Sequence, residues 1–252
     1  MNVTLIGLIL ITIIILFSGF NELRQPTCNR FIFNTYAYLL FMILFLYTIH
    51  LQIIQHKSFT KTLINLPGYS LPTFLINIGL LIALLMTKAK NTITKHLLLL
   101  VWLISFALLT FPITLRTQSL STESLTRIVT IFFSLIFAAT GITILFPKLI
   151  TNKLGFPLLL GLTGLIIAQI LLLIFTPKPS EISQKTAVLT RTAQTSMTYF
   201  AIILFTIFIS YDTHLAIEAS KHCIEGQADY IQYSLGLFLD TVNLFINLEN
   251  AR

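Results

Sequence analysis

The chain has 252 residues, of which 56% are apolar and only 10% are charged. A soluble domain carries about 25% charged residues, so this chain cannot cover a water-facing surface. The Lys and Arg residues give a net charge of +7, but they are spread over almost every predicted loop, which argues against a nucleic-acid partner. The composition therefore indicates an integral membrane protein, with the lipid bilayer as its main partner.

Eight apolar runs are long enough to be membrane helices, which need roughly 20 mostly apolar residues each. They lie near residues 3–20, 31–54, 72–87, 97–115, 125–146, 156–176, 197–219 and 230–248. The runs are continuous rather than alternating, which favours helices over the strands of a membrane barrel. The connections between them are short, so we expect no separate soluble domain.

The first run lacks a preceding basic segment and a small-residue cleavage site, so we expect a retained helix rather than a cleaved signal peptide. Membrane orientation is not predicted by charge. With eight crossings the 16 Lys and Arg residues divide equally between the two sides of the membrane.

The motifs of soluble enzymes are missing from the sequence: it has no Gly-rich phosphate loop, nucleophile elbow or zinc-binding helix motif. We therefore expect no enzyme activity and no resident cofactor. Cys28 and Cys223 fall in loops on the same predicted side. Two cysteines without a spacing pattern favour unpaired thiols, with a disulfide as the alternative.

Two acidic residues lie inside predicted membrane helices, where an ionisable side chain costs at least about 2.5 kcal/mol and marks a functional site. Asp212 lies within YFAIILFTIFISYDTHLAIEA, and Asp240 within IQYSLGLFLDTVNLFINL. In antiparallel neighbouring helices their depths differ by only about 5 Å, so the two carboxyl groups can meet. Two carboxyl groups in a dry bundle should share one proton. The pair is therefore predicted to be a pH-sensitive latch or a pair of ligands for Ca²⁺, which prefers oxygen ligands. His214 points to a different face of its helix and is interpreted as a boundary residue.

A polar stripe follows the last predicted helix. Tyr233, Gly236, Asp240, Asn243 and Asn247 share one helical face. Such a stripe should face the bundle interior or a watery path. For the stripe without the aspartates we favour hydrogen bonding between helices. For the aspartates we favour a function, because burying two acids for packing alone is unfavourable.

At these residues the chain resembles the Bax inhibitor-1, or transmembrane Bax-inhibitor-motif, family. The similarity is densest in ISYDTHLAIEASKH and DYIQYSLGLFLDTVNLFINL, which resemble the family's YDTQ-like element and its SLxLYLDxxNLFxxLL helix. His214 replaces the usual Gln, and the chain reads NLENAR where the family has a longer apolar end. The resemblance covers about residues 28–248, and the stretch around YDT leans towards the family's mitochondrial branch.

The resemblance implies an all-α membrane protein: a seven-helix bundle with a central last helix over residues 28–252, preceded by an additional transmembrane helix and loop over residues 1–27. It also implies calcium leak across organelle or bacterial membranes, a link to control of cell death, and a proton-sensitive pair matching Asp212 and Asp240. Some members link a basic residue of their second helix to that pair. Here the run 72–87 holds no Lys or Arg.

Two functional hypotheses follow. The first is a pH-sensitive calcium leak channel or exchanger centred on Asp212 and Asp240, with Ca²⁺ as the transported or regulatory ion. The alternative is a structural accessory subunit of a large membrane assembly, such as a respiratory-chain complex, that keeps the fold without transport. The extra helix 3–20, which has no partner in a seven-helix fold, and the atypical C-terminus favour the alternative. We expect the mitochondrial inner membrane rather than the endoplasmic reticulum or a bacterial plasma membrane.

Overall fold

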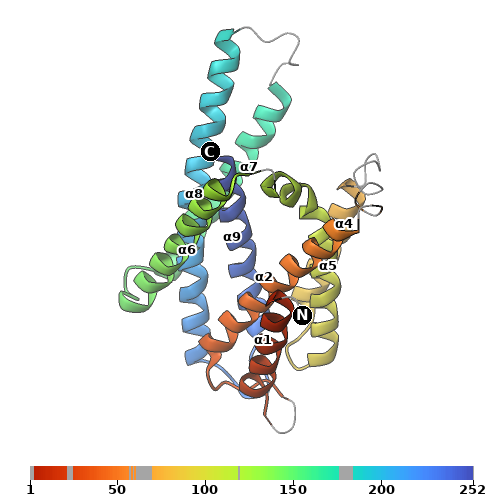
Figure 1. The fold of residues 1–252 in the computed structure, drawn as a ribbon. Helices are drawn as coiled ribbons and strands as arrows, with labels where there is room; N and C mark the ends of the chain where they lie inside the picture. The colour runs from red at the N-terminus through yellow and green to blue at the C-terminus, as the bar shows by residue number, and fades with distance from the viewer. Residues whose placement is uncertain are drawn as a thin grey trace. The chain divides into compact units, whose positions relative to one another are not determined.

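A computed structural model of the chain describes residues 3–21, 25–56, 58, 60, 70–118, 120–175 and 184–251. The described residues form eight α-helices and one short 3-10 helix, and no strand (Figure 1). The helices are α1 (Val3–Gly19), α2 (Phe31–Gln55), α4 (Ser70–Met86), α5 (Thr92–Gln118), α6 (Thr122–Leu145), α7 (Gly155–Phe175), α8 (Gln184–Lys221) and α9 (Tyr230–Asn250), with the 3-10 helix at Asn152–Leu154. Each predicted apolar run corresponds to one helix, so the prediction of an all-α membrane protein is confirmed.

Two helices extend well beyond their apolar runs. The prediction for α8 covered only residues 197–219, whereas the helix spans Gln184–Lys221, or about 57 Å at 1.5 Å per residue. Hydropathy detects only the part that suits lipid, while the polar residues before it are also helical and include no Gly or Pro. Helix α5 spans Thr92–Gln118, whereas the predicted run covered only residues 97–115. Pro112 lies inside this helix and does not end it.

Many threonine hydroxyl groups of the membrane helices bond within their own helix. Thr12, Thr48 and Thr163 each donate to the carbonyl four residues earlier, at 2.7–2.8 Å. These bonds suit a membrane, where water is not present to pair a hydroxyl group. The first turn of α6 is capped by Ser121, whose side chain accepts a hydrogen bond from the backbone N–H of Ser124 at 3.3 Å.

The helices form two compact units. The first contains residues up to 119 together with 216–238. In it α1 packs along α2, where the Ser18 hydroxyl donates to the Asn34 side chain at 2.5 Å and Gly7 lies against Leu44. The expectation that the first helix has no partner is therefore wrong. Small residues on α1 let the two helices approach closely.

The interior of the first unit is aromatic. Trp102 is fully buried, stacks on Phe106 with ring centroids 5.1 Å apart, and meets the edge of Phe238 at 5.8 Å. His50 of α2 bonds to three groups of α5: the Ala107 carbonyl at 2.9 Å and the hydroxyls of Thr110 and Thr114. These contacts fix α2 against α5 beside Pro112.

The second unit contains residues 120–215 and 239–252. Its α6 and α8 are joined by reciprocal bonds: Thr143 donates to the Ser210 carbonyl at 3.2 Å, and Ser210 donates to the Ala139 carbonyl at 3.2 Å. Helix α7 meets α8 at Gly161, where an added Cβ would lie 3.0 Å from a Leu204 methyl group. The absence of a side chain at Gly161 lets the two helices approach closely.

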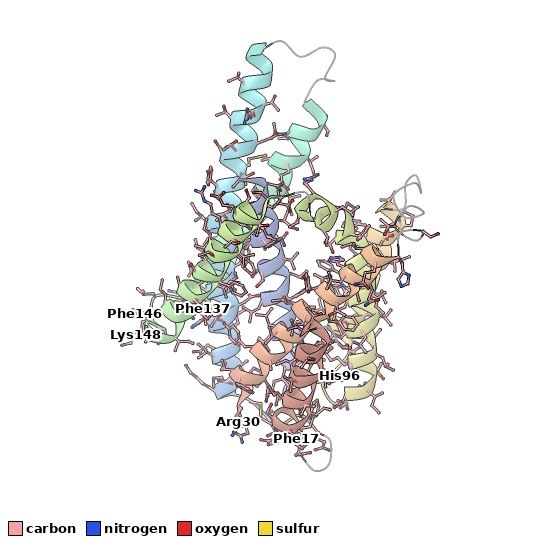
Figure 2. The ribbon with its side chains drawn as sticks, in the orientation of Figure 1. Phe17, Arg30, His96, Phe137, Phe146 and Lys148 are labelled. Carbon is pink, nitrogen blue, oxygen red and sulfur yellow. A yellow bond between two sulfur atoms is a disulfide. The ribbon has the colours of Figure 1, made fainter. Side chains whose placement is uncertain are left out.

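The surface of the helices suits lipid. Five described helices or helix parts are long and apolar enough to cross a membrane: Phe31–Gln55, Thr92–Thr117, Thr122–Leu145, Asn152–Leu172 and Thr190–Lys221. Two shorter apolar helices are Val3–Gly19 and Leu71–Met86. Large apolar side chains such as Phe17 and Phe137 project outward with 85% and 73% of their surface exposed, which suits a bilayer and not water (Figure 2). The chain is thus a multi-pass integral membrane protein.

Helix α9 differs from the others. It is not among the five candidate spans, because its polar stripe lowers its hydropathy. Its apolar residues Leu235, Leu237 and Leu244 are instead almost completely buried by protein. A helix that buries such residues while carrying Asp and Asn is expected to be shielded from lipid.

Candidate functional site: a carboxyl pair between two helices

The structure places the carboxyl groups of Asp212 on α8 and Asp240 on α9 next to each other. Asp212 lies nine residues before the end of α8, and Asp240 lies ten residues after the start of α9. At 1.5 Å per residue these distances are about 14 and 15 Å, so the two carboxyl groups sit at matching depths of an antiparallel helix pair. Both belong to the second compact unit.

One oxygen of this pair has no hydrogen-bond partner within the described chain. It is Oδ2 of Asp240, which is shielded from solvent. The next residue, Thr241, also keeps a buried hydroxyl without a partner, and so does Nδ1 of His214 on α8. A buried polar atom without a partner is costly. An additional proton, water molecule or cation at Asp240 would remove that cost.

A hydrogen bond between two carboxyl groups requires a proton on one of them, because an ionised carboxylate can only accept. A shared proton would let the two adjacent carboxyl groups bond to each other instead of repelling each other. Two negative charges at this separation in a low-dielectric interior would repel each other strongly. The arrangement can thus hold or release a proton, and its release changes the force between α8 and α9.

Three of the four remaining residues of the polar stripe bond within their own helix or pack against a ring. Asn243 donates to the Leu239 carbonyl at 2.9 Å, and Asn247 donates to the Asn243 carbonyl at 2.8 Å. Tyr233 packs its ring edge-on against Phe31 at 5.6 Å. Gly236 lies one helical turn before Asp240 on the same face. The stripe's role in hydrogen bonding between helices stays a prediction.

The proposed calcium ligands also stay a prediction. Within the described ranges no group of three or more His, Cys, Asp or Glu side chains could hold a metal ion. Calcium takes six to eight oxygen ligands, so Asp212 and Asp240 would need water and backbone carbonyls to complete a site.

A buried ion pair in the first unit was not predicted. Lys95 of α5, with a side chain only 3% exposed, donates to Asp229 at 2.5 Å and to the Thr87 carbonyl at 2.9 Å. Asp229 also caps α9 by accepting from the backbone N–H of Gln232 at 3.1 Å. Lys95 lies two residues before the predicted apolar run 97–115 and three residues after the start of α5. Hydropathy alone leaves Lys95 outside the membrane helix, because α5 begins at Thr92, five residues before the apolar run.

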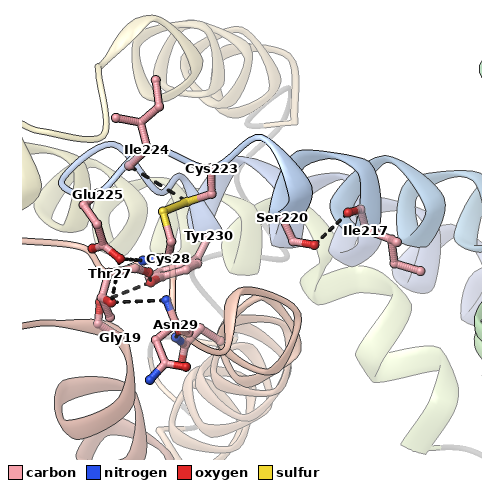
Figure 3. Close-up of a disulfide and its surroundings, with 11 residues drawn as sticks. Gly19, Thr27, Cys28, Asn29, Ile217, Ser220, Cys223, Ile224, Glu225 and Tyr230 are labelled. Atoms are coloured by element: carbon pink, nitrogen blue, oxygen red, sulfur yellow. Dashed lines mark hydrogen bonds between the residues drawn. A yellow bond between two sulfur atoms is a disulfide. The ribbon is translucent and has the colours of Figure 1, made fainter.

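The two cysteines form a disulfide, which corrects the expectation of unpaired thiols. Cys28 and Cys223 are joined with their Cα atoms 5.7 Å apart, within the range that a disulfide bridges (Figure 3). The prediction failed because two cysteines separated by 195 positions carry no spacing pattern, and only the fold shows that their loops meet.

Comparison with known proteins adds one match. A protein-family model described as "Inhibitor of apoptosis-promoting Bax1" matches residues 28–250. No curated protein matches the chain. The matched range begins after α1 and includes both Asp212 and Asp240.

Proposed function

Because the chain belongs to the family described as inhibitor of apoptosis-promoting Bax1, we propose that it is a non-enzymatic, pH-sensitive calcium leak channel or exchanger. Its latch is the Asp212–Asp240 pair. The observation that supports the proposal most directly is the close approach of these two carboxyl groups inside the protein, where Oδ2 of Asp240 is buried without a hydrogen-bond partner.

The latch works through the shared proton. With the proton in place, one carboxyl group donates to the other and α8 is held against α9 at mid-depth. When the proton leaves, two adjacent negative charges repel each other and attract a cation. Ca²⁺ is the cation whose preferred ligands match two carboxylates. Proton loss and Ca²⁺ binding at the pair are therefore linked, and either one changes how α8 packs on α9.

The test is Ca²⁺ flux into liposomes that contain the purified protein, measured across a pH series. The amide of Asp240→Asn replaces the protonated carboxyl group as donor, so this variant keeps the hydrogen bond and has no shared proton to lose. Its flux is expected to stay at the value of the singly protonated pair and to lose the pH dependence of the unmodified protein. Equal pH dependence in both proteins would contradict the latch.

The matched control is Glu218→Gln. This substitution makes the same carboxyl-to-amide change on α8, six residues after Asp212, at a side chain that is 35% exposed and paired with Lys221 at 2.6 Å. The control is expected to keep the pH dependence of the unmodified protein. A loss in the control would show that any neutralised acid on α8 alters flux, and would remove the special role of the pair.

A structural role in a larger membrane assembly is the second candidate, and the length of α8 favours it. Helix α8 is about 57 Å long, whereas the hydrocarbon core of a bilayer is about 30 Å thick. Its polar first turns therefore extend past the lipid, where they are available to another subunit. For this candidate we propose the mitochondrial inner membrane, on the low charge content and the resemblance around YDT. Native-gel sizing after mild detergent extraction separates the two: a large co-migrating assembly supports the structural role, and a monomer or small homo-oligomer supports the channel.

A further inference from the structure

A disulfide joins two connections that are far apart in the sequence. Cys28 lies in the α1–α2 connection and Cys223 in the α8–α9 connection, and both belong to the first compact unit (Figure 3). Among the described residues no cysteine is left free. The bond therefore ties the beginning of α2 to the segment that leads into α9.

Hydrogen bonds around the disulfide join the same two connections. The Glu225 carboxylate accepts from the backbone N–H of Cys28 at 3.0 Å and from the Thr27 hydroxyl at 3.4 Å. The backbone N–H of Gly226 donates to the Pro26 carbonyl at 2.9 Å. The Tyr230 hydroxyl, on the first residue of α9, donates to the Thr27 carbonyl (Figure 3). Such bonds hold the two connections together on both sides of the disulfide.

The backbone at Gly226 is also shaped for this approach. Its φ is +78°, a conformation that side chains other than that of Gly rarely adopt, and a Cβ there would lie 3.3 Å from the Gln25 side chain. We call the Cys28–Cys223 bond with Thr27, Glu225, Gly226 and Tyr230 the disulfide clamp.

We propose that the disulfide clamp is a structural disulfide formed in the native membrane, and that the end of the protein carrying it faces an oxidising compartment. Disulfides persist in oxidising compartments and are rare where thiol reductants are abundant. The clamp therefore predicts the membrane orientation of the protein, which the equal division of Lys and Arg residues between the two sides does not. This inference does not depend on whether the protein conducts calcium.

Reduction of the clamp by dithiothreitol, a dithiol, balances as a thiol–disulfide exchange. A thiolate of the dithiol attacks one sulfur, the Cys28–Cys223 bond breaks, and a mixed disulfide forms. The second thiolate then attacks the mixed disulfide. Two electrons pass to the protein, and Cys28 and Cys223 each take up a proton and become thiols. The dithiol is oxidised to a disulfide.

The clamp end of the first unit includes further segments. Lys95 contacts both the Thr87 carbonyl and Asp229, so the turn after α4 lies at the same end as the α8–α9 connection. Gln55 marks the opposite end, because it closes α2, a 25-residue helix that starts beside the clamp and is about 37 Å long. Lys88 and Gln55 are both exposed and serve as reporters of the two ends.

The first experiment determines the thiol state in native membranes. Free thiols are blocked with N-ethylmaleimide in SDS, the sample is reduced with dithiothreitol, and new thiols are tagged with polyethylene-glycol maleimide. Two tags per chain are expected after reduction, and none when the reduction step is omitted. An absence of tags after reduction would mean that both cysteines were free in the membrane, and would overturn the proposal.

The second experiment determines which way the clamp faces. In sealed native vesicles of known orientation, a membrane-impermeant phosphine is expected to reduce the disulfide only when it is added on the oxidising side. In a Cys28→Ser/Cys223→Ser background, Lys88→Cys should react with an impermeant maleimide from that same side, and Gln55→Cys from the other. Reduction of the unmodified protein from the cytosolic or matrix side alone would refute the orientation, whether or not the variants fold.

Discussion

The buried ion pair between Lys95 and Asp229 yields the sharpest stability prediction. Asp229→Asn removes the counter-charge of an ammonium group that is only 3% exposed. Asn is as good a helix cap as Asp, so the bond from the Gln232 backbone N–H is expected to remain. The loss of stability in this variant therefore reports on the ion pair, because the Lys95 ammonium group stays buried without its counter-charge.

The size of the effect follows from the exposure of the two partners. Removing one partner of a fully buried pair costs about 3–5 kcal/mol. Asp229 is 18% exposed, and Lys95 keeps its bond to the Thr87 carbonyl, so we expect the lower value of about 3 kcal/mol. At about 2–4 °C per kcal/mol for a chain of this size, Tm should fall by about 6–12 °C.

The assay is thermal unfolding of the purified protein in detergent, followed by loss of the monodisperse peak in size-exclusion chromatography. The control is the double variant Lys95→Met/Asp229→Asn, which removes both charges and should recover most of the lost Tm. A single variant with unchanged Tm would show that the ion pair does not stabilise the fold. The Lys95→Met variant is measured as well. If the Tm loss of the double variant equals the sum of the Tm losses of the two single variants, the residues do not act as a pair.

Two further stability predictions concern helix contacts. Gly155→Ala should destabilise the protein, because the added Cβ would overlap the Tyr211 phenol, and the loss should shrink in a Tyr211→Phe background, as measured by Tm. His50→Leu should cost about 1–3 kcal/mol, because the Ala107 carbonyl and the Thr114 hydroxyl lose their shared partner, and a Tm equal to that of the unmodified protein would contradict this.

The helices could be predicted from the sequence because lipid imposes one strong rule: a crossing needs a long apolar run. The same rule explains what was missed at the ends of helices. The polar first turns of α8 are helical without being apolar, and Lys95 lies at the start of α5 although it is charged. Hydropathy identifies the part of a helix that suits lipid, and it does not identify the residue at which the helix begins.

The contact between Asp212 and Asp240 could be predicted because both depths are counted along helices of regular rise. Two residues on consecutive antiparallel helices meet when they lie equally far from the connecting loop. The disulfide could not be predicted by counting residues along a helix. Cys28 and Cys223 lie in loops whose positions are set by the packing of several helices, including α1 on α2, and a sequence without internal spacing cannot report that packing.

The proton shared by Asp212 and Asp240 is the central element of this account, and infrared difference spectroscopy measures it most directly. A protonated carboxyl group gives a carbonyl band that a carboxylate lacks. The unmodified protein in lipid should show this band and lose it over the same pH range in which Ca²⁺ flux changes. The Asp212→Asn/Asp240→Asn variant should lack the band at all of these pH values, and Glu218→Gln should keep it. An unmodified protein without the band, or with a band that the double variant retains, would contradict a shared proton as the latch.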